Sequence, residues 1–162
     1  MRKYILLLWS LLLVSLLCVG CSQNGNGEQT KTFSFMYQQT EIVPHAEAGP
    51  IIARLGEPER YHEYDSCAFQ GKDKRYQYKS VIICTYPKDG ADFIYTIQLK
   101  DDLVETQEGV YIGISMEKVR EIYGEPTEDT GTCYIYRRGK TELNIMYASG
   151  MVSDIVYSIT ND

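Results

Sequence analysis

The sequence has few histidines and no block of basic residues, and each shortage argues against a class of function. Lys and Arg total 16 against 22 Asp and Glu, so the 162 residues carry a net charge of −6. Nucleic-acid binding needs clustered positive charge to displace counterions, so we expect no nucleic-acid partner. The chain has only two histidines, and it shows neither a known metal-ligand spacing nor a nucleophile elbow. We therefore expect a protein that is not an enzyme, with no cofactor and no metal.

The first twenty residues are typical of an export signal. Met1-Arg2-Lys3 is positively charged, and residues 4–19 form an apolar run interrupted only by Ser10 and Ser15. A membrane-spanning helix needs about 20 apolar residues. This run is shorter and fits the hydrophobic part of a secretory signal peptide. An uncleaved N-terminal anchor helix is the alternative, and either predicts export and attachment to a membrane.

The segment Leu17-Cys18-Val19-Gly20-Cys21 resembles the lipobox of bacterial lipoproteins. In that family a diacylglycerol is attached to the cysteine sulfur and the chain is cut just before it. The resemblance implies a signal peptide at 1–20, lipid attachment at Cys21 and a place on the extracytoplasmic face of the cell membrane. Residues 21–31 are polar and rich in Gly and Asn, which predicts a flexible tether.

The body that follows contains one motif twice. Leu55-Gly56-Glu57-Pro58 recurs as Tyr123-Gly124-Glu125-Pro126, each time after a stretch with helical spacing. The glycines and prolines predict helix ends, and Ser115 predicts a helix start. Strand-like runs follow both copies. We predict an α+β fold of two tandem units, 32–100 and 101–162. Each would be a helix followed by a three-strand antiparallel meander, and the two would share a sheet or a core.

This arrangement resembles the beta-lactamase-inhibitor-protein-like superfamily, which includes the small lipoprotein of the outer-membrane assembly machinery. The segments 67–74 (CAFQGKDK), 101–102 and 109–113 (GVYIG) further resemble a group of uncharacterised lipoproteins from gut-type Firmicutes. The resemblance covers about residues 32–160. It implies a binding or scaffolding role in the cell envelope, with the membrane and an envelope protein as partners. It names no small-molecule ligand.

Alternation along the strand-like runs predicts which side chains lie away from the core. The expected outer face is half apolar, where a one-sided antiparallel sheet is normally polar. Such a patch indicates a partner-binding site. Its apolar members are Val81, Ile83, Ile94, Ile135, Met146 and Val156. Two alternatives stay open: β-branched residues simply suit strands, or the N-terminal segment covers them.

The remaining reactive side chains offer two further hypotheses. Three cysteines follow Cys21, and Cys67–Cys84 is the more plausible disulfide, with three free thiols as the alternative. The segment around His62 also holds Glu59, Glu63 and Asp65. A rival interpretation is therefore an envelope enzyme or a metal-dependent binder that uses this segment.

Overall fold

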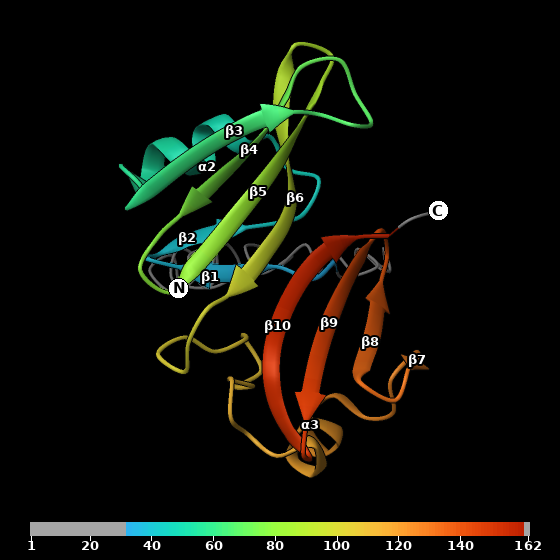
Figure 1. Ribbon diagram of the computed structural model, residues 1–162. Coiled ribbons are helices and arrows are strands. Elements are labelled where there is room, and N and C mark those ends of the chain that lie inside the picture. The colour runs from blue at the N-terminus through green and yellow to red at the C-terminus, as the bar shows by residue number, and fades with distance from the viewer. Residues whose placement is uncertain (1–31, 161–162) are drawn as a thin grey trace, which may run out of the picture.

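One large antiparallel sheet dominates the computed structural model, which describes residues 32–160 (Figure 1). Its eight strands lie in the order β3-β4-β5-β6-β10-β9-β8-β7. The bounds are β3 (Arg60–Asp65), β4 (Lys72–Gln77), β5 (Val81–Lys88), β6 (Ala91–Leu99), β7 (Glu128–Asp129), β8 (Cys133–Arg138), β9 (Thr141–Ala148) and β10 (Met151–Ile159). A hairpin of β1 (Phe35–Tyr37) and β2 (Thr40–Ile42) forms a second sheet, and the helices are α2 (Ala48–Leu55) and α3 (Met116–Tyr123).

The predicted fold class is wrong in its main claim. The described chain is mostly β, built on one eight-stranded sheet with two short helices, and not two helix-plus-meander repeats. The class α+β fits it only loosely. Arg60–Asp65 supplies the edge strand β3, and Glu128–Asp129 adds the edge strand β7 at the other side of the sheet. Each half of the sheet therefore has four strands. A short polar segment can pair its backbone at a sheet edge, and in each half such a segment forms the fourth strand.

The predicted helix ends are confirmed. The Ser115 hydroxyl accepts a hydrogen bond from the Lys118 amide at 3.3 Å, which satisfies one free donor of the first turn of α3. Gly124 ends the helix with φ 78°, a backbone conformation that costs glycine little. Gly56 ends α2 in the same way, with φ 75°. Helix α2 differs at its start, because Glu47 makes no side-chain capping bond there.

A single core lies between one face of the sheet and the other elements. It joins side chains of the β1–β2 hairpin, both helices and the central strands of both halves. Its fully buried members include Phe35, Ile42, Ile83, Ile97, Leu99, Leu143, Ile145, Ile155 and Tyr157. Ala48 of α2 and Val119 of α3 belong to the same cluster. Both described helices therefore lie against one face, and we call the opposite face of the sheet the outer face.

The signal peptide, Cys21 and the predicted tether lie outside the described residues. The boundary between 32–100 and 101–162 falls in the connection after β6, but strands β6 and β10 pair directly across it. Their register joins Ile97 with Tyr157 and Leu99 with Ile155. The two predicted units consequently share backbone hydrogen bonds as well as the core.

Candidate functional site

Three of the six residues predicted for the outer face are in the core. Val81, Ile83 and Ile94 are each 0% exposed, so the prediction that they form a partner surface is wrong. On β5 the residues that face the core are one position away from the predicted ones. Val81 and Ile83 face the core because they pair with Leu99 and Ile97. Such an error follows from a run that is apolar at every position, since alternation then cannot fix which face is buried.

A β-bulge explains the error at Ile94. The register passes from Cys84 opposite Thr96 to Thr85 opposite Ile94, which leaves Tyr95 as the extra residue. Ile94 and Ile97 can therefore both face the core although they are three residues apart. The displaced Tyr95 is 42% exposed.

The other three residues lie on the outer face as predicted, and we call them the outer patch. Ile135, Met146 and Val156 are half-buried and belong to β8, β9 and β10. Asn144 lies between Val156 and Ile135 in the register, and Asp154 pairs with Met146. Three neighbouring strands thus carry the outer patch, and neither described helix packs on it.

Polar pairs lie between and around the side chains of the outer patch. Gln98 donates to Asp154 at 2.9 Å, Asn144 donates to Ser158 at 2.9 Å, and Arg137 binds Glu142 at 2.7 Å. Protein interfaces commonly combine apolar side chains with hydrogen-bonded polar ones. Arg137 and Glu142 balance each other's charge, whereas the Asp154 carboxylate is bound only by the Gln98 amide and the Ile155 N–H, so a partner that covers Met146 must accommodate this charge.

The structure forms no disulfide among the cysteines it describes. Cys67 is exposed in the loop between β3 and β4, whereas Cys84 and Cys133 are half-buried, and all three are free thiols. The predicted Cys67–Cys84 bond is therefore not formed, and the alternative of three free thiols describes this structure. Burial raises the pKa of the Cys133 thiol, which lowers its reactivity.

The segment around His62 does not assemble a metal site. His62 and Glu63 are consecutive on the exposed edge strand β3, so their side chains point to opposite faces. Glu63 is also occupied, because it binds Lys72 and accepts a hydrogen bond from the Tyr61 hydroxyl at 2.9 Å. Within residues 32–160, no three His, Cys, Asp or Glu side chains are grouped so as to hold a metal ion. The rival interpretation has no assembled ligand set in this region.

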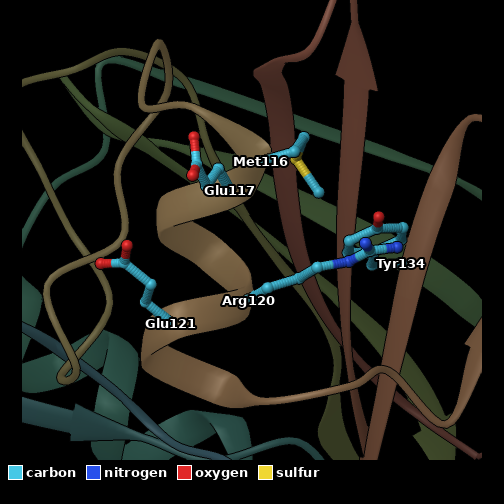
Figure 2. A pocket seen from close by; sticks show the side chains of 5 residues that line it. All are labelled: Met116, Glu117, Arg120, Glu121 and Tyr134. Carbon is cyan, nitrogen blue, oxygen red and sulfur yellow. The ribbon is translucent and has the colours of Figure 1, made fainter.

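A groove beside α3 brings a cation and an aromatic ring together (Figure 2). The Arg120 guanidinium lies 5.1 Å from the centre of the Tyr134 ring on β8, while Glu117 and Glu121 point away from the ring. Glu125 lies 4.0 Å from the same guanidinium. Both side chains of this ion pair are largely exposed, so the pair is weak, and the groove holds Glu117 and Glu121 beside its one cation.

Sequence reasoning missed a second cavity, which we call the cationic pocket. It has a volume of about 500 Å³ and is lined by His45, Lys88 and Lys140 together with the rings of Tyr86 and Phe93. Lys88 ends β5 beside the Asp89-Gly90 turn, and Lys140 lies in the turn between β8 and β9. The available signal was a lysine beside a turn-forming glycine in each half, in Lys88-Asp89-Gly90 and in Gly139-Lys140. Only the pairing of the two halves brings them together.

No described helix is long and apolar enough to cross a membrane. No protein-family model and no curated protein matches this chain. Among solved structures, an extracellular protein containing an SCP domain from Bacillus anthracis str. Ames is similar, with 12% sequence identity and a TM-score of 0.43. The likeness covers 87% of this chain and 50% of that one, so this chain spans about half its length. At this level the likeness assigns neither a family nor a function.

Proposed function

We propose that this protein is a non-enzymatic binding module held at the extracytoplasmic side of the cell membrane by a lipid on Cys21. The lipobox-like segment 17–21 and the apolar run before it support the anchor. The observation that carries the binding role is the outer patch, in which three half-buried apolar side chains come from three neighbouring strands, with Met146 diagonal to Ile135 and Val156 and with Asn144 between those two. The proposed partner is an envelope protein.

The size of the outer patch fits a contact that depends on a few side chains. Interface energy is concentrated in a small apolar centre from which water is excluded, and the rim contributes little. Met146 lies on the central strand of the three that carry the patch, and its flexible side chain can adapt to a partner. Replacing Met146 is therefore the best test of whether a partner binds at the outer patch.

The test is crosslinking in the native membrane, followed by identification of the attached protein. Met146→Asp should abolish the specific crosslink and leave the melting temperature close to that of the natural chain. Leu103→Asp is the matched control, because Leu103 is 69% exposed and lies outside the outer patch. The control should keep the crosslink. A crosslink that survives Met146→Asp would remove the proposed role of this face.

The anchor is tested separately by Cys21→Ser. This variant should not incorporate labelled fatty acid, whereas mass spectrometry of the natural chain should find an acylated N-terminus at Cys21. A natural chain that keeps residues 1–20 and carries no acyl label would instead support the uncleaved anchor helix.

A further inference from the structure

The cationic pocket combines positive charge with aromatic walls in a protein that is acidic overall. His45, Lys88 and Lys140 contribute to its lining, and no lining residue is acidic. The whole chain has a net charge of −6, so three basic side chains around one cavity run against its composition. A concave site lined by one sign of charge concentrates ions of the opposite sign.

His45 is held in this pocket by its backbone and its ring. Its φ is 73°, a left-handed conformation that is uncommon for a residue with a side chain. Its amide donates to the Ile94 carbonyl at 2.9 Å, and its Nδ1 lies 3.2 Å from the Tyr86 hydroxyl oxygen. Strained residues that the surrounding structure fixes in place are concentrated at functional sites.

The surrounding charges act on His45 in the same direction. Burial lowers the pKa of the imidazole, and the positive charges of Lys140 and Lys88 lower it further. Lys88 and Lys140 line the same cavity as the ring. Each lysine is a compact charge suited to a tetrahedral anion.

We propose that the cationic pocket binds a phosphate group, with Lys88 and Lys140 as its charge partners and His45 as a hydrogen-bond donor. When the Tyr86 hydroxyl donates to Nδ1 of His45, the ring carries its proton on Nε2. This N–H group can then donate to the anion. Tyr86 and Phe93 form an apolar wall for whatever carries the phosphate. The phosphate belongs to a soluble compound or to a phospholipid headgroup.

The position of Thr32 makes the headgroup reachable. Thr32 lines the cationic pocket, and residues 21–31 connect it to Cys21. Eleven residues span at most about 40 Å when fully extended, so a lipid on Cys21 limits the distance from the pocket to the bilayer. This step alone rests on the proposed anchor, whereas phosphate binding itself does not.

The test titrates inorganic phosphate into the full chain in a phosphate-free detergent and follows the His45 ring by NMR. Binding should saturate and should weaken at least about tenfold in Lys140→Glu. Lys88→Gln should weaken it similarly. Lys79→Glu is the matched control, since it makes the same charge change at an exposed lysine outside the pocket, and it should bind like the natural chain. A shift that does not saturate, or equal weakening in Lys140→Glu and Lys79→Glu, overturns the proposal.

Two lipid surfaces distinguish the sources of the phosphate. Protection of the Gly139 and Lys140 amides from hydrogen exchange on phosphatidylglycerol vesicles, but not on vesicles of a phosphate-free neutral glycolipid, assigns the headgroup. Saturation by inorganic phosphate without that protection assigns a soluble phosphate. Cys21→Ser should keep phosphate binding, so failure of the anchor and failure of the pocket give different results.

Discussion

Two tyrosine hydroxyls connect the sheet to the ends of the helices. Tyr136 on β8 donates to the Gly124 carbonyl at 3.1 Å, and Tyr78 donates to the Gly56 carbonyl at 3.3 Å. The last carbonyls of a helix have no partner within the helix. Each tyrosine therefore satisfies a helix end while its ring packs in the core.

Replacing Tyr136 with Phe should lower the free energy of unfolding by about 1 kcal/mol, because the hydrogen bond is lost while the ring remains. Urea unfolding at pH 7 measures the effect. Tyr78→Phe provides the comparison and should cost no more, since its bond is longer. An unchanged free energy for Tyr136→Phe would mean that water replaces the hydroxyl at no cost.

The same hydroxyl makes stability depend on alkaline pH. Burial raises the pKa of Tyr136 to about 12 from an ordinary value of 10.0. A pKa raised by folding gives a contribution that is complete below pH 10 and is lost as the pH rises through 12. Unfolding measured from pH 9 to pH 12 should therefore show a shallower fall in stability for Tyr136→Phe than for the natural chain. Parallel curves would contradict this assignment.

At the scale of single residues, the sequence predicts where a helix ends better than it predicts which side chains of a strand point to the core. Ser115 and Gly124 act locally, so their roles follow from the residue type and its neighbours. The facing of Ile83 does not, because Val81, Ile82 and Ile83 are all apolar and all buried. Only the pairing of β5 with β6 decides which of them meets the helices.

At the scale of elements, the two helices have matching ends but different starts. Helix α3 has the Ser115 cap, whereas Glu47 before α2 has φ −61° and ψ 127° and makes no side-chain cap. This backbone already has the extended geometry of a capping residue. Glu47→Ser should therefore raise the free energy of unfolding by roughly 0.5–1 kcal/mol.

Denaturant unfolding measures this gain, and Ser115→Ala serves as the reciprocal variant, expected to lose about 1 kcal/mol. A loss in Glu47→Ser would show that the Glu47 side chain has a stabilising role of its own. The missing cap of α2 is visible in the sequence, since Glu is not among the preferred capping residues. The Tyr95 bulge is not visible there, because no glycine or proline marks it.

At the scale of the whole molecule, the pairing of β6 with β10 decides the architecture. The sequence predicts two similar units but contains no local signal for which strands meet between them. The pairing places Ile97 opposite Tyr157 and extends one sheet through all eight strands. It also brings Lys88 and Lys140 to one cavity, which is why the cationic pocket could not be found from motifs.

This continuity predicts that the body unfolds as one cooperative unit. Ile97 is fully buried and contacts strands from both halves, so Ile97→Ala should cost about 3 kcal/mol through lost burial and a cavity. Native-state hydrogen exchange should show the same loss for amides of β5 and of β9, although these strands belong to different halves. Leu103→Ala is the control, because Leu103 is 69% exposed. It should change the free energy of unfolding and the exchange free energies of the β5 and β9 amides by less than about 0.5 kcal/mol. If only the amides of β5 lost protection, the two halves would be separately stable domains that merely touch along β6 and β10.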